Sequence, residues 1–331
     1  MRVGVIGAGR IGRMHARFIM ENPEVKELVV ADADAGRAEA VAKEVGGEAR
    51  QIEETVSSGL DAVVIAASTS AHAGLVGMCL DAGLPTFCEK PVAAGYEETV
   101  GIARRVESSG TVLQVGFMRR FDPGYVEARR LISSGSVGTI YSIRLATHDY
   151  EPPPESYIPT SGGVFRDMHV HDFDALRFLT GGEVEEVYAT GSVRKFPMFE
   201  KHSDVDTSAI MLTMADGVVA VATGTRQNAL GYDVRTEVIG SDANLAIGFD
   251  SRVALRSTEP NHILAEKPGW SGFPERFEVA YRAEMDHFLR LATGEAENPC
   301  TARDSLEALR VAMAADLSRK ERRPVKMEEI R

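Results

Sequence analysis

Short apolar runs alternate with amphipathic stretches along the first third of the chain. The runs RVGVI, ELVVAD, DAVVIAA, PTFCE and TVLQVG show no polar alternation, and a stretch with helical spacing of apolar residues follows each of the first four. Strands of this kind are buried on both faces, and their alternation with helices is typical of a parallel sheet. We therefore predict an α/β domain with a parallel sheet over residues 1–120.

The pattern changes after Phe121. A helix (PGYVEARRLISSG), a long strand (GTIYSIRLATH), a proline-rich loop and a helix ending at Gly181–Gly182 come first. Six strand candidates then follow in a row: VEEVYATGSVR, TSAIMLTM, VVAVATGTRQ, VRTEVIG, ANLAIG and RVALRS. Asp216–Gly217, between two of them, is a two-residue hairpin signal. Residues 121–331 are therefore predicted to form an α+β domain on an open, mainly antiparallel sheet.

Two of these strands, TSAIMLTM and VVAVATG, are apolar on both faces. One face can pack on the domain's own helices, and the other needs a cover, which favours a homo-oligomer formed through this sheet, a dimer or a tetramer. The alternative is that the segment 261–270 folds over it. The last helix, ARDSLEALRVAMAADLSR, has an apolar stripe and is predicted to pack back on the first domain.

Composition limits the classes of partner. The chain has 331 residues, which favours two domains, and its hydrophobic share of 44% and charged share of 26% are typical of a globular protein. A net charge of −12 repels phosphate backbones, so nucleic acid is not expected as a partner. No apolar stretch approaches the ~20 residues that a membrane span needs, and no membrane association is expected.

The three cysteines, Cys79, Cys88 and Cys300, form an odd set without CxxC spacing. This pattern argues against a disulfide framework or a zinc knuckle and favours a reducing compartment. The first predicted strand begins at Arg2, which leaves no room for a signal peptide. We therefore expect a cytoplasmic protein.

A glycine-rich turn joins the first strand to the first helix. Its hexapeptide, GAGRIG, fits GxGxxG, and Asp32 stands twenty residues past Gly12 at the end of the next strand. This strand–turn–helix context is what a dinucleotide fingerprint requires. Gly7 permits the tight turn, Gly9 lets the backbone approach a pyrophosphate at the helix N-terminus, and Gly12 permits close helix–strand packing. The predicted cofactor-binding residues here are Gly7, Gly9, Arg10, Ile11 and Gly12.

Asp32 indicates which dinucleotide is bound. Its carboxylate can accept hydrogen bonds from both ribose hydroxyls and repels a 2′-phosphate, which favours NAD over NADP. Asp32 could instead cap a helix, a role that Asp34 can fill. Arg37 could tolerate NADP, although a position facing solvent is favoured for it.

Two further loops follow parallel strands at the edge where open α/β sheets bind ligands. Ser68, Thr69 and His72 follow DAVVIAA, where a serine can also simply cap the next helix. Glu89-Lys90-Pro91 ends PTFCE, where a nicotinamide bound to the first domain would lie. An EKP tripeptide alone is equally compatible with a surface turn.

Titratable residues are concentrated in GGVFRDMHVHDFD, residues 162–174. The cluster could be a metal site, an acid–base couple or a charged helix end. On a helix, Asp167, His171 and Asp174 fall near one face, while His169 and Asp172 point elsewhere. The HxH pair could bind a metal only with more ligands nearby, and a structural role is favoured for His169. No metal is expected.

Four motifs together resemble the Gfo/Idh/MocA oxidoreductases, most closely the inositol 2-dehydrogenase-like members. They are GAGRIGRMHA, EKP, QVGFMRRFDPGY at residues 114–125 and GGVFRDMHVHDFD, and the resemblance runs from the first strand to near residue 287. It implies a Rossmann domain followed by an open antiparallel sheet through which these proteins often form tetramers.

The resemblance also implies site residues. The lysine of EKP and a DxxxH pair form the catalytic set, here Lys90, Asp167 and His171, and the Lys90–Pro91 peptide is often cis in the family. Glu89 and Met118 are expected on the cofactor side. The substrate-binding residues implied are Lys90, Arg119, His148, Asp167, His171 and Tyr232. The stretch THDYEPPP departs from the commoner arginine-containing version, with Tyr150 in an unusual place, which leaves the polyol open.

Each catalytic residue has an expected task. Neutral His171 accepts the hydroxyl proton, cationic Lys90 stabilises alkoxide character on the same oxygen, and Asp167 holds a substrate hydroxyl and orients its neighbours. Asp174 is expected to support His171. Asp167 could alternatively only complement the helix dipole.

The sequence therefore predicts NAD-dependent oxidation of a secondary hydroxyl of a cyclitol, myo- or scyllo-inositol, to the ketone. One alternative is the same chemistry on another polyol, such as a pyranose or an anhydrosugar. Another is a non-catalytic NAD- and sugar-binding regulatory protein. For redox-assisted glycoside cleavage, a third alternative, the sequence contains no distinguishing residue.

Overall fold

The computed structural model describes residues 1–261 and 267–330. The chain divides into two compact units, and each is described by itself. The first comprises Met1–Phe121 and Val279–Glu307, and the second comprises Asp122–Glu278 and Ala308–Arg331. The prediction placed all residues beyond 120 in one domain, and it is wrong for Val279–Glu307.

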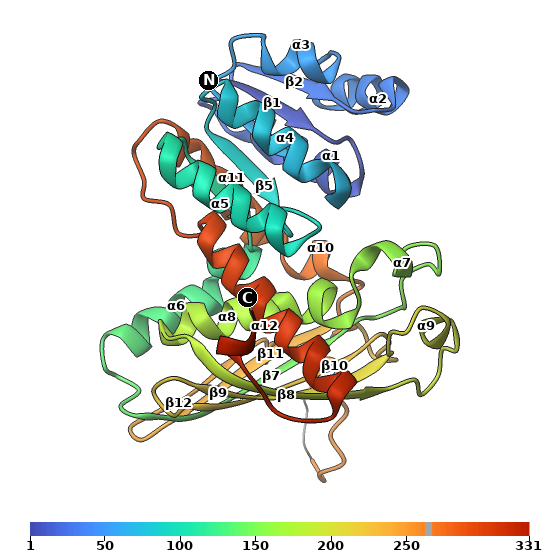
Figure 1. Cartoon of the computed structure of the whole chain (residues 1–331), viewed down its shortest axis with the longest axis vertical. Coiled ribbons are helices and arrows are strands. Elements are labelled where there is room, and N and C mark those ends of the chain that lie inside the picture. The colour runs from blue at the N-terminus through green and yellow to red at the C-terminus, as the bar shows by residue number, and fades with distance from the viewer. Residues whose placement is uncertain (262–266, 331) are drawn as a thin grey trace. The chain divides into compact units, whose positions relative to one another are not determined.

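The first unit is built on a six-stranded sheet with the order β3-β2-β1-β4-β5-β6. Figure 1 labels its strands β1, β2 and β5. Every neighbouring pair of strands is parallel, as predicted. The order reverses between β1 and β4, and open α/β sheets bind ligands at such a switch point. The strands are β1 (Arg2–Ile6), β2 (Glu27–Ala31), β3 (Glu48–Ala49), β4 (Ala62–Ile65), β5 (Thr86–Glu89) and β6 (Leu113–Gly116).

Helices connect these strands, and one returns from late in the sequence. Phe288 of that late helix lies 5.7 Å from Phe87 of β5 between ring centroids, which explains why its segment belongs to the first unit. The helices of this unit are α1 (Arg10–Glu21), α2 (Ala35–Val45), α3 (Ile52–Val56), α4 (Thr69–Asp81), α5 (Tyr96–Ser109), η1 (Met118–Phe121) and α11 (Glu278–Ala292), whose first residue lies in the second unit.

The second unit is built on a seven-stranded sheet with the order β12-β11-β7-β10-β9-β8-β13. Only the β7–β10 pair is parallel, so the sheet is mixed and mainly antiparallel, as predicted. The predicted strand RVALRS, residues 252–257, is not formed. The backbone N–H groups of Val253 and Leu255 donate locally, to the carbonyls of Asp250 and Val253, and not to a neighbouring strand. The strands are β7 (Ile140–His148), β8 (Val184–Ser192), β9 (Thr207–Met214), β10 (Val219–Thr225), β11 (Asp233–Gly240), β12 (Asn244–Ile247) and β13 (Val325–Lys326).

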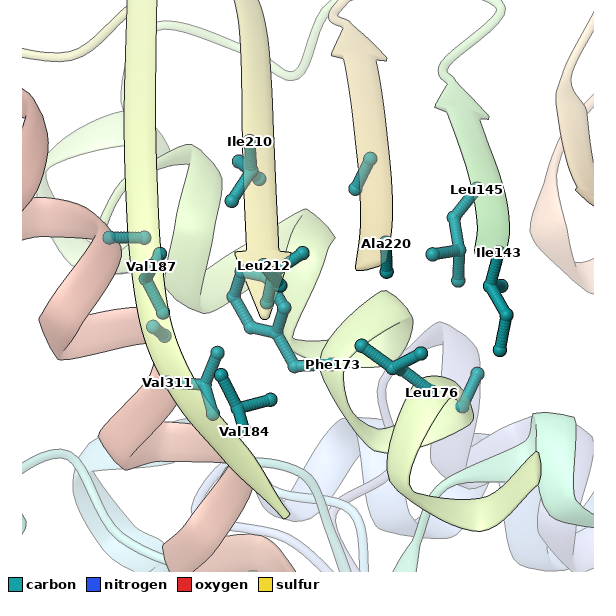
Figure 2. Packing of buried hydrophobic residues seen from close by; sticks show 14 of the residues in the cluster. Ile143, Leu145, Phe173, Leu176, Val184, Val187, Ile210, Leu212, Ala220 and Val311 are labelled. Carbon is teal, nitrogen blue, oxygen red and sulfur yellow. The ribbon is translucent and has the colours of Figure 1, made fainter. Parts of the chain in front are cut away.

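One face of this sheet packs on helices to form the core. Figure 2 shows Phe173 of α8 beside Leu212 of β9, and Val311 of α12 beside Val184 of β8. Residues of α12 from Ala308 onward belong to the second unit, so the predicted packing of the last helix on the first domain is wrong for them. The helical segments here are α6 (Pro123–Ser133), α7 (Ile158–Ser161), η2 (Phe165–His169), α8 (Val170–Thr180), α9 (Met198–Lys201), α10 (Phe273–Arg276), α12 (Ala302–Glu321) and η3 (Met327–Glu329).

The opposite face carries a row of exposed apolar side chains. Tyr188, Met211 and Val221 lie directly across β8, β9 and β10 from one another, and they are 38%, 51% and 41% exposed. The predicted second apolar face of these strands is therefore present. Of the segment 261–270, the alternative cover for it, residues 262–266 lie outside the described residues.

Within residues 1–261 and 267–330, no helix combines the length and the apolar character needed to cross a bilayer. Cys79, Cys88 and Cys300 are buried, and none of the three forms a disulfide. Burial raises the pKa of the Cys79 thiol to about 11, so it stays protonated at neutral pH.

Candidate active site

The turn between β1 and α1 is shaped by its three glycines. Gly7 has a φ of +107°, and a Cβ there would lie 2.5 Å from the backbone of Ala66. At Gly12 a Cβ would lie 1.7 Å from the carbonyl oxygen of Gly7. At Gly9 it would meet nothing within 4 Å, so open space lies at the N-terminus of α1. This arrangement fits a bound pyrophosphate, with Arg10 and Ile11 in the first helical turn.

Asp32 stands beside this turn. Its carboxylate accepts hydrogen bonds from the backbone N–H groups of Ala8 (2.7 Å) and Asp34 (2.8 Å) and from Nη2 of Arg37 (2.9 Å). Burial raises the pKa of Asp32, but these donors outweigh it and hold the pKa below its usual value. Asp32 is therefore an ionised acceptor, which suits a ribose diol.

The neighbours of Asp32 bear on two alternatives, and the structure settles the first of them. Asp34 is the N-cap of α2, since its side chain accepts from the backbone N–H groups of Gly36 and Arg37. Asp32 is therefore free of that role. Arg37 is largely exposed, as expected, yet it also forms an ion pair with Asp32 that was not predicted from the sequence.

The loop after β4 places Ser68 at the N-cap position of α4, followed by Thr69. The Ser68 hydroxyl lies 3.3 Å from that of Ser70 and does not cap the helix. His72 is 1% exposed, with Nδ1 2.7 Å from the carbonyl oxygen of Pro91 and Nε2 3.1 Å from that of Ala67. The structure thus gives His72 a role in holding the Pro91 turn, and direct cofactor contacts of these residues stay predictions.

A second histidine, His15, contacts the EKP turn through Glu89. Nε2 of the fully buried His15, on α1, lies 2.7 Å from Oε1 of Glu89. The Lys90–Pro91 peptide is cis, as the resemblance implies. His15 and His72 therefore fix the two sides of Lys90 within the first unit. This role of His15 was not predicted from the sequence.

Met118 and Arg119 begin the short helix η1 directly after β6, and each is 2% exposed. They lie in the first unit with Lys90 and the glycine turn. Their predicted contacts with cofactor and substrate remain predictions.

In the second unit, the titratable cluster does not form a uniform α-helix. Phe165–His169 is a π-helical segment, which continues as α8 from Val170. Such wide turns occur mostly as single insertions and are frequent at functional sites. Asp167 lies in the middle of the π segment and His171 in the first turn of α8, a local change of helix type that apolar spacing does not predict.

Asp167 accepts two hydrogen bonds from outside the segment. The Tyr157 hydroxyl donates to Oδ1 at 2.9 Å, and Nη1 of Arg226 donates to Oδ2 at 2.9 Å. Arg226 follows β10 and is 3% exposed, and it also contacts Oδ2 of Asp149 at 3.3 Å. Neither Tyr157 nor Arg226 was predicted from the sequence as a site residue, because a single arginine or tyrosine outside a motif carries no periodic signal.

His169 is a structural residue. Its Nδ1 lies 2.7 Å from Oδ2 of Asp172 and its Nε2 lies 2.7 Å from Oγ of Ser208, while Thr147 donates to the other oxygen of Asp172 at 2.8 Å. Ser, His and Asp in this order resemble a hydrolase triad. All three are at most 3% exposed, however, so no substrate reaches the serine. With both ring nitrogens engaged, His169 is also a poor metal ligand.

His171 is half-buried and Asp174 is fully buried. Both lie on α8, which continues the π segment that carries Asp167. Their predicted place on one face with Asp167 assumed regular α-helical spacing and stays a prediction. The expected support of His171 by Asp174 stays a prediction.

His148 and Tyr232 lie in neighbouring parts of the sheet, at the end of β7 and just before β11. Nδ1 of His148 lies 2.9 Å from the hydroxyl oxygen of Thr225. Burial lowers the pKa of His148, although Asp233 acts in the opposite direction, so the ring is neutral at pH 7. Tyr232 is buried, and its backbone N–H donates to the carbonyl of Trp270 at 2.7 Å. Tyr150 is 42% exposed on the loop that departs from the family pattern.

Comparison with known families agrees with this geometry. Residues 1–117 match the oxidoreductase family with an NAD-binding Rossmann fold, and residues 125–246 match the GFO/IDH/MocA C-terminal domain. The chain belongs to the Gfo/Idh/MocA oxidoreductase family. This confirms the resemblance that the sequence motifs indicated. The cofactor of the protein is NAD.

Individual relatives cover nearly the whole chain. The myo-inositol dehydrogenase Hyg17 of Streptomyces leeuwenhoekii is 39% identical over 96% of this chain and 97% of its own. The crystal structure of a myo-inositol dehydrogenase from Corynebacterium glutamicum has a TM-score of 0.90 at 31% identity and covers 98% of both chains. That of scyllo-inositol dehydrogenase from Lactobacillus casei, with bound NAD(H) and scyllo-inositol, has a TM-score of 0.88 at 28% identity and covers 99% of both.

The candidate residues thus form two groups, one in each unit. The first unit brings together the glycine turn, Asp32 and Lys90, and the second brings together Asp167 and His171. The first group can bind a dinucleotide and present a cation. The second can accept protons and bind hydroxyl groups.

Proposed function

We propose that this protein oxidises one secondary hydroxyl of a cyclitol, myo- or scyllo-inositol, to the ketone with NAD. The observation that carries the proposal is the environment of Asp167. Its two oxygens accept hydrogen bonds from Tyr157 and Arg226, and its π segment continues into α8, which bears His171. A carboxylate and an imidazole on one helix suit a polyhydroxylated ring. Relatives named for myo- and scyllo-inositol support the choice of ring.

The proposed catalytic residues are Lys90, Asp167 and His171. His171 accepts the proton of the reacting hydroxyl, and the ammonium of Lys90 stabilises the negative charge that develops on that oxygen. Asp167 accepts a hydrogen bond from a substrate hydroxyl and so fixes the ring. Bound NAD supplies the acceptor for the hydride. This proposal requires the two groups of residues, one from each unit, to act on one substrate.

The remaining site residues are proposed for binding. On the cofactor side they act on the pyrophosphate, the ribose and the nicotinamide. A simple apolar alcohol would leave the polar groups on the substrate side without partners at ~1–3 kcal/mol each, which favours a polyol. The proposed cofactor-binding residues are Gly7, Gly9, Arg10, Ile11, Gly12, Asp32, Ser68, Thr69, His72, Glu89, Lys90 and Met118, and the substrate-binding residues are Lys90, Arg119, His148, Asp167, His171 and Tyr232.

The exposed sheet row of Tyr188, Met211 and Val221 supports a homo-oligomer, a dimer or tetramer formed through the second unit's sheet. We further propose a cytoplasmic location, which the free buried cysteines support. The first unit would serve the cofactor, and the second would bind substrate and mediate assembly.

The test is a steady-state assay with NAD against a panel of inositols, pyranoses and anhydrosugars, with His171→Ala as the diagnostic variant. We expect turnover of myo- or scyllo-inositol, and a kcat lower by ~10²–10⁴ in His171→Ala with nearly unchanged NADH affinity. Turnover of pyranoses alone would contradict the cyclitol assignment. A protein that binds NADH, oxidises no polyol and co-purifies with a partner would instead be regulatory.

A further inference from the structure

The carboxylate of Asp167 is held between two donors that no motif contains. Tyr157 precedes α7 and donates to one oxygen, and Arg226 follows β10 and donates to the other, each at 2.9 Å. The two donors come from segments about seventy residues apart in the sequence and meet at one side chain. Both oxygens of Asp167 are therefore engaged by groups outside its own helix.

Arg226 remains a cation although it is almost completely buried. A buried guanidinium is stable only when it is paired and hydrogen-bonded. Burial lowers the pKa of Arg226, but the carboxylates of Asp167 and Asp149 outweigh it and hold the pKa above its ordinary value. Asp204 adds to this effect, and the ring of Phe199 lies 5.9 Å from the guanidinium carbon.

Tyr157 keeps its hydroxyl proton and so remains a hydrogen-bond donor. Desolvation of its hydroxyl, together with the adjacent Asp167, raises the pKa of Tyr157. The phenol is therefore protonated at neutral pH, and its hydrogen can be donated to the carboxylate.

We propose that Arg226 and Tyr157 are positioning residues that fix Asp167 as an ionised hydrogen-bond acceptor for a substrate hydroxyl. The inference rests on the proposed function. An ionised carboxylate accepts hydrogen bonds and cannot donate them. Protonating Asp167 would weaken both its ion pair with Arg226 and its bond from Tyr157, so the proton of the reacting hydroxyl goes to His171 and not to Asp167.

The same contacts link Asp167 to the loop between β7 and α7. Asp149 begins this loop and contacts Arg226, and Tyr157 ends it and contacts Asp167. The loop includes Tyr150 and the PPP sequence in which this chain departs from the common family pattern. A change in the loop should therefore alter how firmly Asp167 is held, and with it the KM for the substrate.

The experiment is a double-mutant cycle between Tyr157→Phe and Asp167→Asn, read out as KM and kcat on the inositol that the unmodified protein oxidises. Tyr157→Phe removes one hydrogen bond to a charged group and keeps the ring. We expect it to raise KM by about tenfold with a smaller change in kcat. In the Asp167→Asn background the same change should alter KM by less than about twofold, because Tyr157 acts through Asp167.

Arg226 is tested by Arg226→Gln and Arg226→Lys. The first should lower kcat/KM by about 10- to 100-fold, and the second should recover part of the loss because it retains the charge. Tyr141→Phe and Arg130→Gln are matched controls, since Tyr141 is 59% exposed on β7 and Arg130 pairs with Glu127 on the surface of α6. NADH affinity, measured by fluorescence titration, should be unchanged throughout.

Two outcomes would overturn this inference and leave the proposed function intact. One is an unchanged KM in Tyr157→Phe in an otherwise active protein. The other is a full additional loss from Tyr157→Phe in the Asp167→Asn background, which would show that Tyr157 acts independently of Asp167. Inactivity of the unmodified protein towards every polyol would instead contradict the proposed function itself. Should Arg226→Gln fail to fold, Tyr157→Phe decides, because the Tyr157 side chain is 43% exposed and its ring is retained.

Discussion

At the scale of single residues, charge near the dinucleotide turn is set by one carboxylate and its donors. Asp32 is ionised and accepts from two backbone N–H groups, and it also pairs with Arg37. A ribose diol can donate to this carboxylate, whereas a 2′-phosphate would be repelled by it. Arg37 pairs with Asp32 and is a cation that can also pair with a 2′-phosphate, so we expect the discrimination against NADP to come from the charge of Asp32.

Replacing Asp32 therefore changes cofactor choice. We predict that Asp32→Ser raises KM for NAD by about tenfold and lowers KM for NADP, because the repulsion is removed while Arg37 remains able to pair with a 2′-phosphate. Steady-state kinetics with both cofactors would measure the change. In Asp32→Ser/Arg37→Gln the gain for NADP should be lost. An unchanged ratio of kcat/KM for NAD over NADP in Asp32→Ser would refute the role of the carboxylate.

Sequence reasoning at this scale succeeded where a motif places residues in a fixed order. Gly7, Gly9 and Gly12 have the conformations and spaces that their positions in the fingerprint require. Arg226 and Tyr157 could not be found in this way. Their contacts with Asp167 depend on how a loop and a strand end meet a helix, which periodicity within any one segment does not encode.

At the scale of elements, the π segment Phe165–His169 determines how Asp167 is presented. Two contacts hold this segment in place. His169 is hydrogen-bonded to Asp172 and Ser208, and strand β10 lies close to His169 and Met168. Gly224 of β10 permits this approach, because a Cβ there would lie 2.5 Å from Nε2 of His169 and 2.9 Å from Sδ of Met168. The apolar spacing of residues 162–179 predicted a helix correctly but could not predict the inserted residue of the wider turn.

We predict that Gly224→Ala destabilises the protein by about 1–3 kcal/mol, because the added methyl group forces His169 and Met168 to move. Since both belong to the segment that carries Asp167, kcat should fall as well. Urea denaturation and kinetics would measure the two effects. Gly101→Ala is the matched control: a Cβ on this helix α5 glycine meets nothing within 4 Å, so stability should rise by about 0.5–1 kcal/mol. Equal stabilities for the two variants would show that the contact at Gly224 is not tight.

At the scale of the whole molecule, the sequence predicted both sheets and their strand directions, but it misassigned segments that pair far along the chain. The helix at Val279–Ala292 belongs to the first unit, and Val311 belongs to the core of the second. The error for the last helix has a physical cause. An amphipathic stripe shows that a helix packs against something, but it does not identify the surface that it packs against.

The same holds for the exposed row of Tyr188, Met211 and Val221 on the second sheet. The sequence pattern shows that this face is apolar, but it does not show what covers it. A second copy of the chain can present the identical row, and a two-fold interface of this kind is self-complementary.

We predict that Met211→Glu, at the centre of the row, shifts the protein to a smaller oligomer, because an unpaired carboxylate buried in the interface would be costly. Met211 is 51% exposed in the single chain, so the variant should still fold. Light scattering after size exclusion gives the mass, and Val126→Glu on α6, at 46% exposure, is the control that should keep the unmodified mass. If Met211→Glu also keeps that mass, this face does not hold the subunits together, and the row must be covered in another way.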